Sequence, residues 1–315
     1  MLLELTDLTV SYGKKVVLDN LNLQIKGGAI GLLGPNGAGK STLIKTLLGF
    51  LVPTTGYINL FGKRVKSSKT EIRQLIGYMP ENDSYIPGVS AVSFVGYAGE
   101  LCGMDRKAAR QRAHEVLNYV GIDEIRYRPV ETYTTGVRQR LKLAQALVHD
   151  PDLLLLDEPT NGMDQRGRES MLSLVSNLVL EQNTNVIFSS HILKDIESTC
   201  TSIIALNDGK IALSGELKTM RDSQQIAYEI ELKGDIEPFL VQLDILGFKC
   251  EKISELRILA IPNQQFLDSV QQLDRISHQF FQLAFETNAK IRHLRLVKPS
   301  LEDIFHQQLS VSHLS

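Results

Sequence analysis

The sequence predicts an α/β fold with a largely parallel sheet, followed by a second and smaller α+β domain. The apolar run Ala29–Leu33 is typical of a fully buried central strand. From Leu153 to Leu206, short apolar strands alternate with segments of helical periodicity, which indicates a sheet covered by helices on both faces. The length of 315 residues suits two domains, and a polar run at 222–225 separates them.

Each element is predicted from its own local pattern. Alternating apolar residues in the first 26 positions predict two antiparallel strands joined by a turn at 11–15. A glycine-rich segment follows the central strand and leads into a helix that ends near Gly49, and helical periodicity returns between 90 and 125. The remaining expected elements of the first domain are strands at 57–61, 75–79, 153–157, 186–189, 203–206 and 211–213, and helices at 171–180 and 192–199.

The second domain is expected to be a small α+β module. We place the boundary between 1–220 and 221–315 because the clean strand alternation at 228–232 begins after the polar run. Helical patterns are expected at 237–246 and 266–273, and strands at 256–261 and 294–297. An aromatic cluster formed by His278, Phe280, Phe281 and Phe285 is expected to pack in the core of this module.

Composition excludes several classes of protein. Lys and Arg total 34 and Asp and Glu total 36, so a formal net charge of −2 argues against binding to nucleic acid through bulk charge. No apolar stretch reaches the roughly 18 residues that cross a bilayer. Acidic Glu4 and Asp7 stand where a signal peptide has basic residues. The three cysteines are widely spaced and odd in number, so reduced thiols in a soluble intracellular protein are expected.

A phosphate-binding loop is predicted where the central strand meets the first helix. The pattern Gly34-x-x-x-x-Gly39-Lys40-Ser41 lets successive backbone N–H groups point at phosphate oxygens, and the positive end of the helix adds to them. Lys40 would neutralise the β- and γ-phosphates, and the Ser41 hydroxyl would bind Mg²⁺. The expected nucleotide-binding residues are Gly34, Pro35, Asn36, Gly37, Ala38, Gly39, Lys40, Ser41 and Thr42.

Two carboxylates end a second buried strand, at Asp157 and Glu158. A parallel strand delivers such residues to the carboxyl edge of the sheet, where ligands of this fold class bind. Asp157 would join the Mg²⁺ shell, and Glu158 would orient and deprotonate the attacking water. Solvated acids that merely cap a strand are the alternative, and the neighbouring phosphate loop disfavours it.

Residues 1 to about 220 resemble the ATP-binding subunits of ABC transporters. Tyr12 stands where that family places an aromatic ring against adenine, and His191 resembles its switch histidine. Asp164 ends a segment similar to the D-loop that crosses to a second subunit. The resemblance implies a P-loop NTPase with a RecA-like core, an antiparallel β subdomain and a helical subdomain at about 90–150. The signature motif, which would contact ATP on the partner, is matched by Thr134, Thr135, Gly136 and Val137.

Two positions depart from the family's pattern. The signature has Thr134-Thr135-Gly136 where Ser-Gly-Gly is usual, so Thr135 brings a β-carbon close to the partner's nucleotide. Glu81 replaces a glutamine that faces Mg²⁺, and its carboxylate adds a negative charge beside Glu158 and the phosphates. The resemblance gives Glu81 both a metal-binding and a catalytic role.

The segment 298–305 is similar to the closing motif of ABC-2-type exporter ATPases, including those of antibiotic resistance and drug efflux. The alternatives are an importer-type ATPase with a regulatory C-terminal domain and a non-transport ABC ATPase that acts on ribosomes or chromosomes. A single set of motifs and the short stretch between Lys40 and Thr135 disfavour the latter.

The resemblance also implies partners and a location. Two copies, or one copy and a paralogue, would pair head to tail around ATP and Mg²⁺. A separate ABC-2-type membrane permease would dock on the helical stretch 90–125, which would hold the chain at the cytoplasmic face of the membrane. No nucleic acid is expected to bind.

Overall fold

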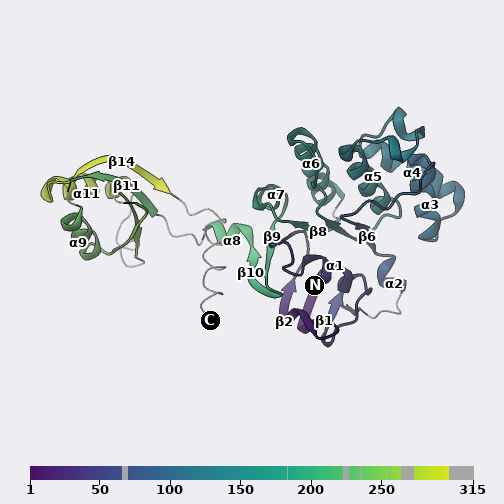
Figure 1. Ribbon diagram of the computed structural model, residues 1–315, viewed down its shortest axis with the longest axis horizontal. Helices are drawn as coiled ribbons and strands as arrows, with labels where there is room; N and C mark the ends of the chain where they lie inside the picture. The colour runs from purple at the N-terminus through teal and green to yellow at the C-terminus, as the bar shows by residue number, and fades with distance from the viewer. Residues whose placement is uncertain are drawn as a thin grey trace. The chain divides into compact units, whose positions relative to one another are not determined.

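The computed structural model describes residues 1–65, 70–182, 184–222, 227–234, 236–254, 256–263 and 273–297. These residues form two compact units: residues 1–218 belong to the first, and the second begins at Thr219 (Figure 1). Helix α8 (Leu217–Asp222) spans this division. Among the described residues, no helix has both the length and the apolar character needed to cross a membrane.

A six-stranded sheet forms the centre of the first unit. All neighbouring strands in it run parallel, except for an antiparallel strand at one edge. Every residue of β3 and β7 is buried, as the two apolar runs predict. The strands are, in spatial order, β10 (Lys210–Glu216), β9 (Ser202–Asn207), β3 (Ala29–Leu33), β8 (Asn185–Ser190), β7 (Leu153–Asp157) and β6 (Ile76–Met79).

Helices connect the parallel strands and pack against them. Helix α1 (Lys40–Leu47) contacts both the six-stranded sheet and the second sheet of this unit. Helix α7 (Leu193–Thr199) lies so close to β3 that a β-carbon at Gly31 would be 2.2 Å from Cγ2 of Ile196. Helix α6 (Gln165–Gln182) packs beside α7 and against β8. The layered α/β architecture predicted from the sequence is therefore confirmed.

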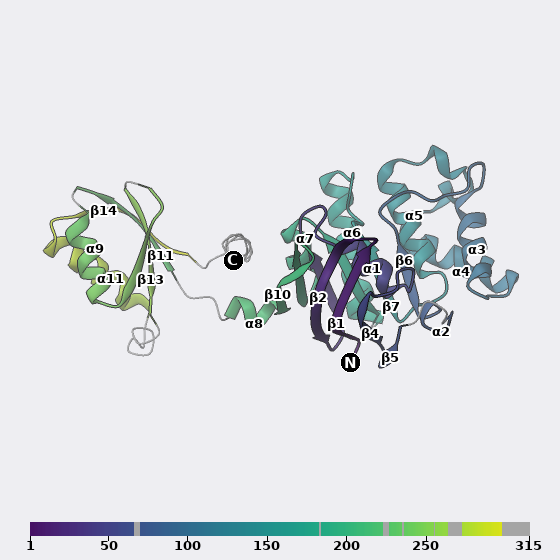
Figure 2. The ribbon, with the colours of Figure 1, turned by 60° about the horizontal axis from the view of Figure 1, so that its bottom comes forward.

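A four-stranded antiparallel sheet packs against this core (Figure 2). Its strands share one cluster of buried apolar side chains with α1 and with the six-stranded sheet. The backbone N–H of Asp19 donates to the carbonyl of Gly209 at 2.9 Å, which joins the two sheets directly. The strands are, in spatial order, β2 (Lys15–Ile25), β1 (Leu3–Tyr12), β4 (Thr55–Leu60) and β5 (Lys63–Arg64).

The helices between β6 and β7 gather away from the antiparallel sheet (Figure 1). The side chain of Ser90 accepts from the Ser93 N–H at the start of α3, and Asp105 accepts from the Lys107 N–H at the start of α4, which are ordinary N-caps. This group consists of α3 (Ala91–Leu101), α4 (Arg106–Tyr119), the short 3₁₀ turns Glu124–Tyr127 and Val130–Thr132, and α5 (Thr135–Leu147), while the short helix α2 (Thr70–Arg73) precedes β6.

The described residues of the second unit form an antiparallel sheet with two helices on one side (Figure 2). Its strand order is β12-β13-β11-β14, and its element order is βαββαβ, which is the split βαβ arrangement of ferredoxin-like folds. The elements are β11 (Ala227–Lys233), α9 (Glu237–Ile245), β12 (Phe248–Lys252), β13 (Arg257–Pro262), α11 (Leu273–Glu286) and β14 (Lys290–Val297).

The expected aromatic core cluster of this unit is wrong except at one position. Phe280 is fully buried, whereas Phe281 is 53% exposed, Phe285 is 88% exposed, and His278 is also exposed. The helical period explains the difference, because the buried side of α11 is set by Ile276, Phe280, Leu283 and Ala284. Strand β12 and helix α11 were not predicted. The helical pattern at 266–272 and the motif at 298–305 lie outside the described residues.

Candidate active site

The phosphate-binding loop lies between β3 and α1, as its pattern predicts. Gly37 and Gly39 have φ angles of 87° and 106°, in the left-handed region that L side chains rarely adopt. A β-carbon at Gly39 would lie 2.6 Å from Cδ2 of Leu18, and one at Gly34 would lie 2.6 Å from the carbonyl oxygen of Leu206. Gly39 is therefore required by both close packing and backbone conformation, whereas Gly34 is required by packing and Gly37 by conformation.

A cavity of about 370 Å³ opens over this loop. It brings together four segments that are far apart in the sequence, because Val17, Glu81 and Glu158 face the same space as the loop. Gly34 and Ala38 belong to the loop but do not line the cavity, and the carbonyl of the buried Ala38 accepts a hydrogen bond from the Gly209 N–H at 3.2 Å. The lining residues are Val17, Pro35, Asn36, Gly37, Gly39, Lys40, Ser41, Thr42, Glu81 and Glu158.

The Lys40 side chain is buried and folded back onto the loop. Its Nζ donates to the carbonyl of Gly34 at 2.7 Å and lies 3.4 Å from Oε1 of Glu158. Burying a charged group is costly unless the group is paired, and here Lys40 and Glu158 are each other's partner. Lys40 and Glu158 thus neutralise one another in this arrangement of the cavity.

Glu158 is held by the strand end beside it. It has a φ of 50°, and its backbone N–H donates to Oγ of Ser189 at 2.9 Å. The same hydroxyl donates to Oδ1 of Asp157 at 2.7 Å. All three residues are buried, so one serine fixes both neighbouring acids. A non-glycine residue in this left-handed conformation is strained, and such strain clusters at functional sites.

His191 completes the arrangement around Glu158. It directly follows β8, which neighbours β7, so both residues reach the carboxyl edge of the sheet. Nδ1 of His191 lies 2.9 Å from Oε2 of Glu158, while the His191 side chain remains 49% exposed. One carboxylate oxygen therefore faces a lysine and the other a histidine.

The residues expected at Mg²⁺ fit an ion that is held partly by nucleotide phosphates. Ser41 and Glu81 line the cavity, and Asp157 is buried at its edge. Burial and the negative charges of Asp157 and Glu81 raise the pKa of the nearby Tyr78 to about 12, which marks this edge as acidic. The described residues contain no group of three His, Cys, Asp or Glu that could hold a metal alone. Mg²⁺ in nucleotide sites typically uses one or two carboxylates together with phosphate oxygens and water.

The signature residues do not line the cavity. Thr134 stands at the N-cap position of α5 without a side-chain capping hydrogen bond, and Thr135, Gly136 and Val137 form the first turn of the helix. A β-carbon at Gly162 would lie 3.1 Å from Cγ2 of Thr135, so the signature packs on the segment that follows Glu158. The backbone N–H groups at this helix end are available to an anion.

The segment that contains Asp164 is held by a buried ion pair. Asp195, on α7, accepts from Oγ1 of Thr160 at 2.9 Å and from Nε of Arg168 at 2.8 Å. Asp164 itself accepts from the Gly167 N–H at 3.0 Å and so caps α6. Tyr12 lies at the end of β1 and is 48% exposed.

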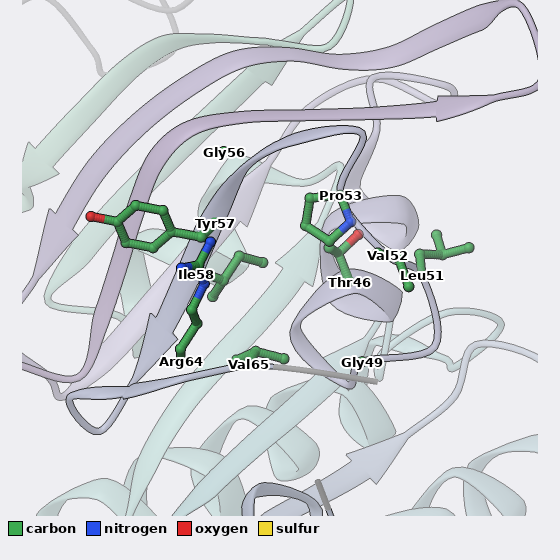
Figure 3. Close-up of a pocket in the computed structure, with 10 residues that line it drawn as sticks. All are labelled: Thr46, Gly49, Leu51, Val52, Pro53, Gly56, Tyr57, Ile58, Arg64 and Val65. Carbon is green, nitrogen blue, oxygen red and sulfur yellow. The ribbon is translucent and has the colours of Figure 1, made fainter. Parts of the chain in front are cut away.

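A second cavity of about 550 Å³ lies between α1 and the β4–β5 hairpin, apart from the predicted site residues (Figure 3). Its walls are mainly apolar, and Cζ of Arg64 lies 4.6 Å from the ring centre of Tyr57. The lining residues are Thr46, Gly49, Leu51, Val52, Pro53, Gly56, Tyr57, Ile58, Arg64 and Val65.

Comparisons with known proteins identify the family. The family described as ABC transporter matches residues 18–161. The bacitracin transport ATP-binding protein BcrA of Bacillus licheniformis is 38% identical over 67% of this chain and 68% of its own. The linearmycin resistance ATP-binding protein LnrL of Bacillus subtilis is 30% identical over 96% of this chain and 97% of its own. The chain belongs to the ABC transporter ATP-binding proteins.

A solved structure supports the same conclusion. The dimeric ATP-binding cassette MJ0796, bound to ADP and phosphate after hydrolysis, matches with a TM-score of 0.62 and 25% identity over 68% of this chain and 98% of its own. This ABC protein is therefore an ATPase with the nucleotide-binding fold of the family, as the resemblance implies.

Two contributors to the ABC site were not found from the sequence. Ser189 joins Asp157 to Glu158, and Asp195 anchors Thr160. The pair of serines before His191 is a weak signal for the first. Nothing in the sequence separates Asp195 from the solvated acids that are common on helices.

Proposed function

We propose that two copies of this chain, or one copy and a paralogue, pair head to tail around ATP and drive export through a separate ABC-2-type membrane permease. One observation carries the pairing: the signature lies at the start of α5, outside the cavity that holds Lys40, Glu81 and Glu158. A second chain could bring its own helix end to that cavity. The related cassette MJ0796 is dimeric, which supports pairing of two such chains.

At the nucleotide, Lys40 would leave Glu158 and neutralise the β- and γ-phosphates, while the backbone N–H groups of the loop bind their oxygens. Ser41, Asp157 and Glu81 would hold Mg²⁺, which supplies electrostatic stabilisation of the charge on the transferred phosphoryl group. Tyr12 would stack on the adenine ring.

Hydrolysis would depend on Glu158 as the general base. Once Lys40 turns to the phosphates, Oε1 of Glu158 is free to accept a proton from water, while His191 at Oε2 keeps the carboxylate oriented. The base is therefore free of Lys40 only when ATP is bound. From the partner, Thr134, Thr135, Gly136 and Val137 would contact the γ-phosphate, and Asp164 would lie at the interface.

Export is favoured over import by the relatives. LnrL, named for linearmycin resistance, aligns over 96% of this chain, a range that extends into the second unit. We therefore assign residues 1–220 to the ATP-binding domain and 221–315 to an accessory domain shared with such exporters. A permease docked on residues 90–125 would hold the protein at the cytoplasmic face of the membrane, without a role for nucleic acid.

Two variants test the pairing. Glu158→Gln removes the base and keeps the binding residues, so the expected result is an ATP-dependent dimer in light scattering coupled to gel filtration. Lys40→Ala is the matched control, and we expect it to lose ATP binding and to stay monomeric. A Glu158→Gln protein that stays monomeric in saturating Mg-ATP would refute head-to-tail pairing.

A pull-down from native membranes in mild detergent tests the permease. The expected partner is a polytopic protein identified by mass spectrometry. Recovery with a periplasmic or surface substrate-binding protein would favour an importer, and recovery with ribosomes would favour a non-transport ATPase.

A further inference from the structure

A buried lysine on α5, the helix that begins with the signature, belongs neither to the apolar core nor to the nucleotide cavity described above. Lys142 lies on α5 about two turns after the signature, and its side chain is only 6% exposed. Its Nζ donates to the carbonyl of Pro80 at 3.0 Å and to the carbonyl of Glu81 at 2.8 Å, and it lies 3.5 Å from Oδ1 of Asp83. All of these partners belong to the short segment that follows β6.

A second cation on the same face of α5 binds the same segment. Arg138 precedes Lys142 by four residues, so the two side chains lie on one side of the helix. Nη1 of Arg138 lies 3.1 Å from Oδ2 of Asp83, and its Nε donates to the carbonyl of Tyr133 beside the signature. The Arg138 guanidinium also lies 5.7 Å from the ring centre of Tyr85. Each carboxylate oxygen of Asp83 thus forms an ion pair with one of the two cations.

The position of these contacts matters because the segment carries Glu81. Lys142 binds the main chain of Glu81 itself, while the Glu81 side chain lines the nucleotide cavity. Buried ammonium groups require several partners, and these partners fix the direction of the two carbonyls that flank the Glu81 α-carbon, the first of which belongs to the Pro80–Glu81 peptide. The direction of that peptide determines where the Glu81 carboxylate begins.

We propose, on the basis of the proposed head-to-tail pairing, that Lys142 is a positioning residue that ties Glu81 at one ATP to the signature helix at the other. Within each chain Glu81 faces the chain's own nucleotide, whereas the start of α5 faces the partner's. A rigid hydrogen-bonded link between the two makes the alignment of one site depend on the other. The physical basis is direct contact between α5 and the 80–83 segment rather than proximity alone.

The first test is a double-mutant cycle on ATP turnover. Lys142→Met keeps the length of the side chain and removes its donors, and we expect kcat to fall about tenfold because a displaced catalytic group loses rate steeply. In a Glu81→Ala background there is no carboxylate to position, so adding Lys142→Met should change kcat by less than about twofold. If Lys142→Met lowers kcat by the same factor in the Glu81→Ala background as in the unmutated protein, the proposal is overturned.

Arg140→Met is the matched control. Arg140 lies on the same helix, but its guanidinium donates to the carbonyl of Val120 at 2.7 Å and to Oγ of Ser170 at 2.8 Å, away from Glu81. We expect this variant to lower thermal stability with little change in kcat. If Arg140→Met and Lys142→Met reduce kcat equally, Lys142 has only a structural role.

A binding measurement provides a readout that does not depend on turnover. In the Glu158→Gln background, Lys142→Met should leave the ATP affinity of the monomer within about twofold and weaken the ATP-dependent dimer about tenfold. An unchanged dimer would contradict the proposal. If the Glu158→Gln parent itself fails to dimerise, the proposed pairing is wrong, while the kcat cycle still decides whether Lys142 positions Glu81.

Two gentler variants guard against misfolding of Lys142→Met. Lys142→Arg retains charge and donors and should recover most of the lost turnover. Asp83→Ala removes a partly exposed acid that both cations bind, so it should lower kcat in the same direction. The proposal fails if Asp83→Ala has full activity and Lys142→Arg is no better than Lys142→Met.

Discussion

Ser189→Ala is the most informative single substitution near the catalytic acids. The hydroxyl of Ser189 donates to the Asp157 carboxylate at 2.7 Å and accepts from the Glu158 N–H at 2.9 Å, and Ser189 is completely buried. Alanine leaves a buried carboxylate oxygen and a buried N–H without this partner. Glu158, with its φ of 50°, also loses the contact that holds its backbone in a strained conformation.

The expected cost follows from these two bonds. A hydrogen bond to a charged group contributes about 1.5–3 kcal/mol, and a neutral one contributes about 1 kcal/mol. We therefore expect Ser189→Ala to lower the free energy of unfolding by about 3 kcal/mol. Turnover should fall by about tenfold to a hundredfold because Glu158 shifts from its position.

Ser190→Ala is the control, because Ser190 is about as buried as Ser189 and its hydroxyl, among the described residues, makes one hydrogen bond, accepting from the Ile192 N–H at 3.0 Å. The control should cost about 1 kcal/mol. Urea denaturation followed by circular dichroism gives the stabilities, and phosphate release gives the turnover. If the two variants differ by less than about 0.5 kcal/mol and have equal turnover, the bridging role of Ser189 is refuted.

Three further predictions concern other parts of the first unit. Asp195→Ala leaves the partly buried Arg168 without its carboxylate partner, so differential scanning calorimetry should show a free energy of unfolding lower by about 3 kcal/mol. An unchanged melting temperature would contradict this prediction. Thr135→Gly removes the methyl group packed near Gly162 and should preserve or raise turnover; a large loss in phosphate release would mean that the side chain is used. Burial lowers the pKa of His149, so its contribution to stability is complete above the unfolded pKa of about 6.5 and is lost as the pH falls toward the folded pKa. His149→Gln should therefore reduce the drop in urea midpoint between about pH 7.5 and 5.5, and an equal drop in both proteins would contradict the assignment.

Central strands were predictable because their patterns are local. β3 and β7 have the bounds expected from their apolar runs, since strands buried on both faces need no alternation. Helix α11 was not predicted, because Phe281 and Phe285 place aromatic side chains on its exposed side and obscure the apolar stripe. The edge strand β12 is short and mostly charged, so its pairing with β13 depends on tertiary structure.

In the site, too, residues in local patterns were predictable and residues that depend on tertiary structure were not. Lys40 and Glu158 were identified from the phosphate-loop pattern and from the buried strand that ends in acids, and His191 from its place in the order of motifs. The three residues meet at one edge of the cavity. Ser189 was missed because its role depends on β7 and β8 being neighbours, with Asp157 directly opposite Ser189 in the register. Lys142 was missed because a lysine in a helix is usually solvated, and its burial arises only when the 80–83 segment folds over it.

The register of the second unit has a consequence for chain architecture. Ala227, where its first strand begins, pairs directly with Val297, where its last strand ends. Paired residues in antiparallel strands have α-carbons about 5 Å apart, so the described sheet of this unit begins and ends at two neighbouring points in space. A two-residue hairpin could bridge those points at little loop-closure cost. The described sheet of this unit can therefore be removed or replaced as one piece, since its first and last residues are already neighbours in space.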